Sequence, residues 1–295
     1  MKPSLSIMVV FSSVVSFLLV PRLGVLYESP WLRSVLLFIG GMLVTGSANA
    51  INQVVEKDTD AKMKRTAKRP IASGRMSVTE GWAFAIITGA IGVGILGWYF
   101  NWLSAAVAAF SLFLYAFIYT PLKKVNAISV FVGAFPGALP CLIGWVAGTG
   151  VLWPMERYEV PGSTESYSNL GGWVLFGIQF LWQFPHFWAI AWVAHRDYST
   201  AGFKLLPSDQ GPTKFTALQT IIYSLLLIPM CAWPYYIGLS GVVSLVIVTL
   251  MNLFLVFQCV RLYRENDAKA ARRVMFTSYA HLAVVLLALL GDKTG

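Results

Sequence analysis

The chain has 295 residues, of which 57% are hydrophobic and only 12% are charged, about half the charged share of a soluble domain. This composition excludes an ordinary soluble globular protein and indicates an integral membrane protein. The net charge of +9 does not call for nucleic acid as a partner, because the basic residues follow a sided pattern that membrane topology explains.

Apolar windows long enough for a membrane helix, about 20 residues each, recur along the whole chain and predict nine spans. The first window resembles a secretory signal but is followed by no small-residue cleavage site, so it is kept as a helix. The last window is interrupted by Ser278 and His281. We expect a single domain over residues 1–295: an all-α, polytopic bundle of about nine transmembrane helices around a central cavity open to the cytoplasmic side. The windows are roughly 4–26, 34–55, 80–100, 102–120, 126–147, 170–194, 216–238, 240–261 and 274–291.

Lysine and arginine concentrate after the second, fourth, sixth and eighth spans, whereas the alternate loops are neutral or acidic. Because basic residues collect in cytoplasmic loops, this pattern predicts a cytoplasmic N-terminus and a C-terminus outside. No Arg-rich amphipathic segment precedes the first span, which favours a bacterial plasma (inner) membrane over an organelle. The loops at 56–80 and 195–214 are both rich in polar residues and are predicted to face each other on the cytoplasmic side.

The second span ends in an acidic motif. Asn52, Glu56 and Asp60 are spaced by four, so on a helix they advance by only about 40° per step and share a face, whereas Asp58 falls on another side. One amide and two carboxylates are oxygen ligands that suit Mg²⁺ when a substrate diphosphate supplies the others. The alternative is a solvated loop that obeys the positive-inside rule, but that rule does not explain costly carboxylates at a membrane boundary. Basic residues follow at once and can neutralise a diphosphate: Lys62, Lys64, Arg65, Lys68 and Arg69.

Two further segments carry candidate chemistry. Tyr119, Lys123 and Lys124 end the fourth span and either hold diphosphate or anchor the helix at the interface. His186 lies within the sixth span, where a histidine is either functional or simply hydrogen-bonded in the interior. Arg196, Asp197 and Tyr198 follow that span, and Asp197 is a candidate to bind a second metal ion or to orient a basic residue.

The fifth span is broken by three glycines and two prolines, Gly133, Pro136, Gly137, Pro140 and Gly144. Such residues permit the close approach of a neighbouring helix or of a flat ligand. Helix packing is the favoured interpretation.

At these residues the chain resembles the UbiA-type intramembrane prenyltransferases and, within them, the protohaem IX farnesyltransferases or haem O synthases. The acidic motif Asn-x-x-x-Asp-x-x-x-Asp of that superfamily appears as Asn52, Glu56 and Asp60. The haem-modifying branch continues with a signature spelled here Met63-Lys-Arg65-Thr66-Ala-Lys-Arg69-Pro70. The likeness extends through Tyr119-Thr-Pro-Leu-Lys123-Lys124, the Gly/Pro stretch of span five, Pro185-His186-Phe187, Asp197-Tyr198 and Leu206-Pro207.

The sequence departs from the family pattern in three places. Lys124 stands where arginine is frequent, and Cys141 where a second proline often follows Pro140. The second acidic motif, Asp-x-x-x-Asp, is missing from span six and its following loop, which puts a two-carboxylate second metal site in doubt.

The resemblance implies transfer of a farnesyl group from farnesyl diphosphate to a vinyl group of haem b, giving haem O. Asn52, Glu56 and Asp60 would hold Mg²⁺, and Arg65, Arg69, Lys123 and Lys124 would stabilise the departing diphosphate. Haem b is then a substrate rather than a resident cofactor. The expected partners are the two substrates, the lipid bilayer and haem A synthase or proteins that assemble terminal oxidases. The substrate-binding set is expected to be Lys64, Tyr119, Lys124, His186, Arg196, Asp197 and Tyr198, with His186 near the iron or a propionate and Arg196 near a propionate.

Three alternatives stay open on the residues alone. One is a prenyltransferase of the same fold acting on another aromatic or tetrapyrrole acceptor. The second is a transporter or proton relay, although its carboxylates would be expected nearer the middle of the bilayer. The third is a structural membrane subunit, which leaves the acidic face unexplained.

Overall fold

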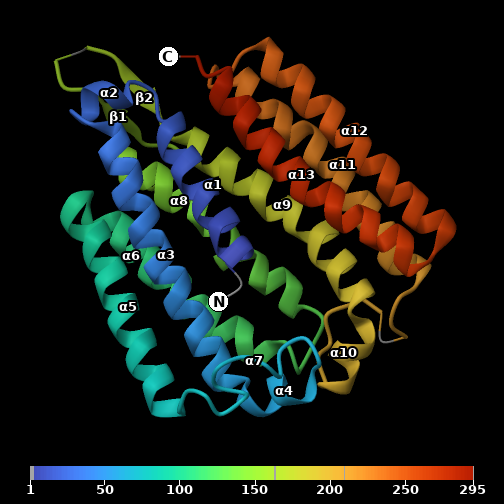
Figure 1. Cartoon of the computed structure of the whole chain (residues 1–295). Coiled ribbons are helices and arrows are strands. Elements are labelled where there is room, and N and C mark those ends of the chain that lie inside the picture. The colour runs from blue at the N-terminus through green and yellow to red at the C-terminus, as the bar shows by residue number, and fades with distance from the viewer. Residues whose placement is uncertain (1–2, 163, 209, 295) are drawn as a thin grey trace.

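The computed structural model describes residues 3–162, 164–208 and 210–294, and most of them are helical (Figure 1). Among these residues, eight helical segments are long and apolar enough to cross a membrane, which confirms the predicted all-α membrane fold. They are α3 (Pro30–Val55), α5 (Val78–Tyr99), the continuous segment formed by α6 (Trp102–Phe113), the π-helix η1 (Leu114–Tyr119) and α7 (Thr120–Leu122), then α8 (Ser129–Thr149), α9 (Leu170–Val193), α11 (Lys214–Tyr236), α12 (Val242–Glu265) and α13 (Ala268–Gly291).

The first predicted span is shorter than expected. Helix α1 (Pro3–Leu19) has 17 residues and ends before Pro21, whose ring disfavours a helical conformation in the preceding residue. Arg22 then adopts a left-handed conformation (φ 55°), and a separate short helix, α2 (Leu23–Leu26), follows. The last predicted span forms the full helix α13. Its two polar residues are accommodated, because Ser278 donates to the Met275 carbonyl and His281 bonds to Asn252 of α12.

The helices form a closed arrangement in which α1 contacts α3, α8 and α13. Helix α9 occupies a central place, packing against α8, α11 and α13. Short elements lie at the two ends of the bundle (Figure 1). One end carries α4 (Lys57–Lys62), α7 and α10 (His195–Thr200), and the other carries α2 and an antiparallel pair, β1 (Arg157–Glu159) and β2 (Ser166–Ser168).

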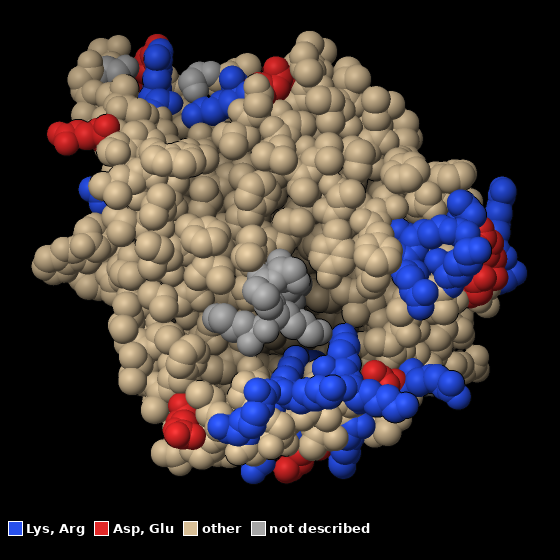
Figure 2. All heavy atoms as spheres, viewed as in Figure 1, with Lys and Arg blue, Asp and Glu red and all other residues tan. Residues whose placement is uncertain are grey.

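Charge is distributed unequally between the two ends. Figure 2 shows blue side chains gathered at the α4 end and at the turn between α12 and α13, with an uncharged belt above them. The loops that follow the predicted even-numbered spans therefore share one end, as predicted. Large apolar side chains are exposed on the membrane-spanning helices, among them Trp31, Trp98 and Trp102 at the ends of α3, α5 and α6, which are 75%, 80% and 72% exposed. Such surfaces are typical of contact with lipid, and tryptophan is enriched near membrane interfaces.

The glycines of α8 allow close packing, as the favoured interpretation held. A Cβ atom on Gly144 would lie 1.9 Å from the Ser13 carbonyl oxygen of α1, and one on Gly137 would lie 1.9 Å from Oε1 of Gln183 on α9. Pro140 cannot donate to the Pro136 carbonyl, which instead accepts a hydrogen bond from Ser111 at 3.3 Å. Helix α8 thus stays continuous and lies close to three neighbours.

Candidate active site

A cavity of about 410 Å³ lies inside the bundle, within the size range of small-molecule sites. Side chains of α1, α3, α6, η1, α8, α9 and α13 line it, and most are apolar. Arg65, Tyr119 and Tyr198 also line it. These three belong to segments at the basic end of the bundle, so the predicted polar loops adjoin the central cavity.

We expected the acidic motif on one uninterrupted helix. The structure instead places it at a break between two helices. Helix α3 ends at Val55 and α4 begins at Lys57, with Glu56 in a non-helical conformation between them (φ −98°, ψ 14°). The helical spacing is nevertheless maintained. The Glu56 amide donates to the Asn52 carbonyl at 2.9 Å, and the Asp60 amide donates to the Glu56 carbonyl at 2.7 Å. The residues Asn52, Glu56 and Asp60 are 7%, 5% and 0% exposed, whereas Asp58, which was predicted to fall on another side, is exposed.

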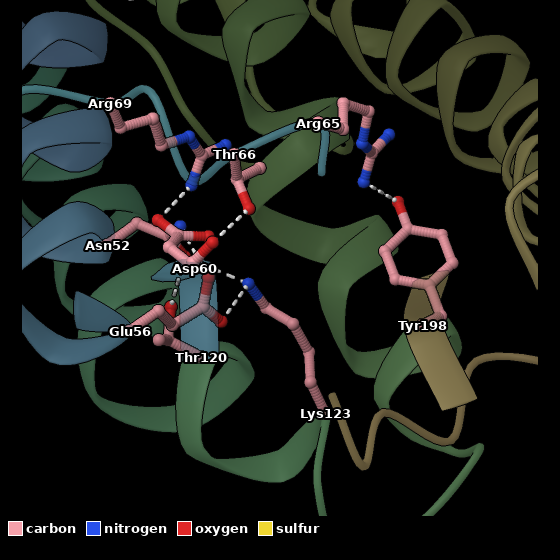
Figure 3. A network of polar contacts seen from close by, with 9 residues as sticks. All are labelled: Asn52, Glu56, Asp60, Arg65, Thr66, Arg69, Thr120, Lys123 and Tyr198. Carbon is pink, nitrogen blue, oxygen red and sulfur yellow. Dashed lines mark hydrogen bonds and ion pairs between the residues drawn. The ribbon is translucent and has the colours of Figure 1, made fainter. Parts of the chain in front are cut away.

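Lys123, which follows α7, completes this cluster from a different part of the chain (Figure 3). Its ammonium donates to Oδ1 of Asn52 at 2.8 Å and to Oε1 of Glu56 at 2.9 Å, and the Asn52 amide donates to Oε2 of Glu56 at 2.7 Å. The π-helical turn η1 precedes Lys123 and places its ammonium 4.6 Å from the ring centre of Tyr119. Burial opposes the charge on Lys123, but the neighbouring tyrosine and glutamate oxygens outweigh it and raise the lysine pKa.

Arg69 pairs with the second carboxylate of the motif. Its guanidinium donates to Oδ2 of Asp60 at 2.6 Å, and the Thr66 hydroxyl donates to the Asp60 backbone carbonyl at 2.9 Å. Burial raises the pKa of the Asp60 carboxyl, against the opposing effect of Arg69. The other carboxylate oxygen, Oδ1, is buried and has no hydrogen-bond partner. A buried acceptor of this kind is costly unless it serves a ligand.

The donor set fits a hard cation held jointly by protein and substrate. Within the described residues there is no group of three or more His, Cys, Asp or Glu side chains that could hold a metal ion alone. Two carboxylates and one amide oxygen are instead the partial set that Mg²⁺ takes when phosphate oxygens complete its coordination. The unpartnered Oδ1 of Asp60 is an available ligand atom. Asn52, Glu56 and Asp60 are therefore fitting ligands for a magnesium diphosphate.

The loops at 56–80 and 195–214 contact each other at the basic end, and the second also contacts the segment after α7. Arg65 donates to the Tyr198 hydroxyl at 2.7 Å and lies over its ring (Figure 3). The Lys204 amide donates to the Lys123 carbonyl at 2.9 Å, and Met63 packs against Phe203. The sequence-based expectation that these loops face each other is confirmed.

Other predicted residues lie apart from this cluster. Lys64, Lys124 and Arg196 are exposed and Asp197 is half-buried, and in the described part of the chain no side-chain bond links any of the four to the acidic cluster. Their expected role in binding substrate remains a prediction. His186 lines the cavity, as does Tyr119.

Two threonines that the sequence did not single out as candidates also belong to the cluster. Thr66 supports the backbone at Asp60, and Thr120 bonds to the Tyr115 carbonyl at 2.8 Å and to Oδ1 of Asn52 at 3.4 Å. Both lie inside the quoted motifs, beside Arg65 and Tyr119. Their position within those motifs is the feature of the sequence that could have identified them as members of the site.

Comparisons with known proteins agree with this geometry. The model of the UbiA prenyltransferase family matches residues 9–280. A protein of Cytophaga hutchinsonii named protoheme IX farnesyltransferase is 44% identical over 289 residues, covering 97% of this chain and 93% of the relative. Two solved structures share the fold. One concerns a digeranylgeranylglyceryl phosphate synthase (TM-score 0.74, 18% identity, 97% of this chain and 93% of that one). The other is a UbiA homologue of Archaeoglobus fulgidus bound to GPP and Mg²⁺ (TM-score 0.61, 15% identity, 97% and 99% covered).

Proposed function

Because the chain belongs to the UbiA prenyltransferase family, we propose that it is a protohaem IX farnesyltransferase acting as one domain over residues 1–295. It transfers the farnesyl group of farnesyl diphosphate to a vinyl group of haem b, giving haem O and diphosphate. The Cytophaga relative is named protoheme IX farnesyltransferase, and the Met63-to-Pro70 signature in this sequence supports the same acceptor.

The observation that carries the proposal is the position of the polar cluster against the apolar cavity. Asn52, Glu56 and Asp60 provide oxygen ligands, and Lys123 and Arg69 provide cations, all within a buried network. Tyr119 lines the cavity and also contacts the Lys123 ammonium. A diphosphate held at the cluster would thus place an attached prenyl chain among apolar side chains.

The chemistry begins with cleavage of the C1–O bond of farnesyl diphosphate, with the electron pair leaving on the diphosphate. Magnesium, when bound with the diphosphate, neutralises part of the charge that develops there. Lys123, Arg69 and Arg65 supply fixed positive charge for the same leaving group, Arg through paired donors and Lys as a point charge. The vinyl group of haem b then attacks the allylic carbon. A new C–C bond forms, and the positive charge moves to the carbon beside the porphyrin.

Water adds to that carbon and loses a proton, which gives the hydroxyethylfarnesyl side chain. No strong protein base is needed for this step, because the proton leaves an oxonium group. The apolar lining of the cavity has the role of excluding water until the C–C bond has formed. Tyr119, whose ring lies beside Lys123, shields the cationic chain from the polar end.

The chain is an integral membrane protein, and we place it in a bacterial plasma membrane with its basic end in the cytoplasm. The charge asymmetry of the two ends supports this orientation. It puts the N-terminus inside and the C-terminus outside, so that farnesyl diphosphate enters from the cytoplasmic side. Haem O would pass from the bilayer to haem A synthase or to proteins that assemble terminal oxidases.

The test is mass spectrometry of haem extracted after purified protein is incubated with haem b, farnesyl diphosphate and Mg²⁺. Farnesylated haem should form with the wild type and be lost in Asp60→Ala. The matched control is Asp58→Ala, which removes an exposed carboxylate two residues away and should retain activity. Formation of product from 4-hydroxybenzoate but not from haem would instead support another acceptor.

A further inference from the structure

His186 is a buried histidine whose two ring nitrogens have different surroundings. Its side chain is 0% exposed and lies two turns from the end of α9, which is about 10 Å along the helix. Nδ1 is 2.8 Å from the Ser278 hydroxyl of α13. Nε2 is buried and has no hydrogen-bond partner.

The hydrogen bonds around Ser278 favour one tautomer of His186. The Ser278 hydroxyl lies 2.7 Å from the Met275 carbonyl and 2.8 Å from Nδ1 of His186. When its single hydrogen is donated to the carbonyl, the hydroxyl accepts from Nδ1, which is then the donor. A neutral imidazole carries a proton on only one ring nitrogen, so Nε2 then has a lone pair available for a ligand. A histidine whose second nitrogen is fixed in this manner is the usual arrangement of a metal ligand.

The surroundings of the ring suit a large planar partner. Trp182 stacks on His186 with ring centres 4.5 Å apart, and Tyr279 lies edge-on at 4.5 Å. All three side chains line the central cavity together with Phe187. Tyr279 is half-buried whereas His186 is fully buried, so ligation through Nε2 would require a neighbouring ring such as that of Tyr279 to move.

His281 provides the internal comparison. It too is 0% exposed, and its Nε2 bonds to Asn252 while Nδ1 has no partner. It does not line the cavity. An unpartnered ring nitrogen is therefore not enough to identify a metal ligand. His186 differs from His281 because it lines the cavity.

We propose that His186 Nε2 is an axial ligand of the haem iron and that Ser278 is its positioning residue. This inference rests on the proposed function, because haem b is the substrate named there. Ligation would hold the macrocycle at one depth in the cavity, so that a vinyl group is presented toward the diphosphate site at the end of the bundle. His186 would thereby position the acceptor without taking part in bond making or breaking.

The experiment measures haem b binding to the purified full chain by absorption spectroscopy and by resonance Raman of the ferrous form. His186→Asn is the informative variant, because its amide nitrogen can replace Nδ1 toward Ser278 while no atom replaces Nε2. We expect the iron–histidine vibration to be present in the wild type and lost in His186→Asn. Imidazole added to a His186→Gly variant should restore it, and Ser278→Ala should weaken haem binding by about tenfold.

His281→Gln is the matched control, since glutamine can replace Nε2 toward Asn252, and its spectrum should equal that of the wild type. An unchanged iron–histidine vibration in His186→Asn would overturn the proposal, as would wild-type protein that binds haem without such a vibration. Both results leave the proposed function intact if the wild type farnesylates haem. Failure of the wild type to bind haem or to farnesylate it would refute the proposed function separately.

Discussion

The Lys123→Met substitution removes the ammonium that holds two buried groups of the acidic cluster. Lys123 contacts Glu56 at 2.9 Å and Asn52 at 2.8 Å, and the side chains of the ion pair are 10% and 6% exposed for Lys123 and Glu56. Methionine fills a similar volume but leaves the Glu56 carboxylate buried without a cation. Breaking a buried pair in this way costs about 3–5 kcal/mol.

A double-mutant cycle separates the ion pair from the rest of the substitution. Glu56→Gln in the Lys123→Met background removes the stranded charge, so part of the lost stability should return. We expect a coupling energy of about 2 kcal/mol. Farnesyl transfer should not return, because the double variant lacks both a presumed magnesium ligand and a cation for the leaving group.

The assay is unfolding of the purified protein in detergent, followed by circular dichroism as a denaturing detergent is titrated. Lys124→Met is the stability control, because Lys124 is the exposed neighbour of Lys123 and its replacement should change unfolding by less than about 0.5 kcal/mol. If Lys123→Met unfolds like Lys124→Met, or if the two losses of the cycle simply add, the ion pair does not stabilise the cluster as argued.

Further predictions concern helix packing, capping and metal dependence. Gly137→Ala should destabilise the fold by about 1–3 kcal/mol, because its Cβ would overlap a glutamine of α9, whereas Gly94→Ala, with nothing within 4 Å, should be neutral or stabilising in the same unfolding assay. Ser77→Ala should cost about 1 kcal/mol, since it removes the capping box with Glu80 at the start of α5. The same unfolding assay measures this loss, and an unchanged stability of Ser77→Ala would contradict it. Removal of Mg²⁺ with EDTA should abolish farnesyl transfer, and Asp60→Asn should raise the Mg²⁺ concentration needed for half-maximal rate; activity that persists in EDTA would exclude the metal from the reaction.

The helical architecture was predictable because it depends on local properties of the chain. A bilayer requires about 20 consecutive apolar residues per span, and hydropathy identifies them without knowledge of the contacts between them. The same locality explains the error at the first span, because hydropathy continues through the break at Val20–Arg22. Backbone preferences at Pro21, rather than apolarity, decide that break.

The acidic motif was predictable in part. Spacing by four placed Asn52, Glu56 and Asp60 together, and the backbone bonds across the break preserve that spacing. The identity of their partners was not accessible to the same argument. Lys123 and Lys124 are adjacent and chemically equivalent in the sequence, and the folded chain alone shows that Lys123 is buried in the cluster while Lys124 is exposed.

The amino-acid pattern was sufficient to predict that this chain spans a membrane, that its basic loops share one end, and that an oxygen-ligand motif lies where a helix leaves the apolar region. Each of these follows from composition or from short-range spacing. The packing of the helices was needed to establish that Lys123 pairs with Glu56, 67 residues away, that Arg65 donates to Tyr198, and that Ser278 lies within hydrogen-bond distance of Nδ1 of His186. These contacts join segments far apart in the chain, and they exist because the packing of separate helices brings complementary groups into one buried space.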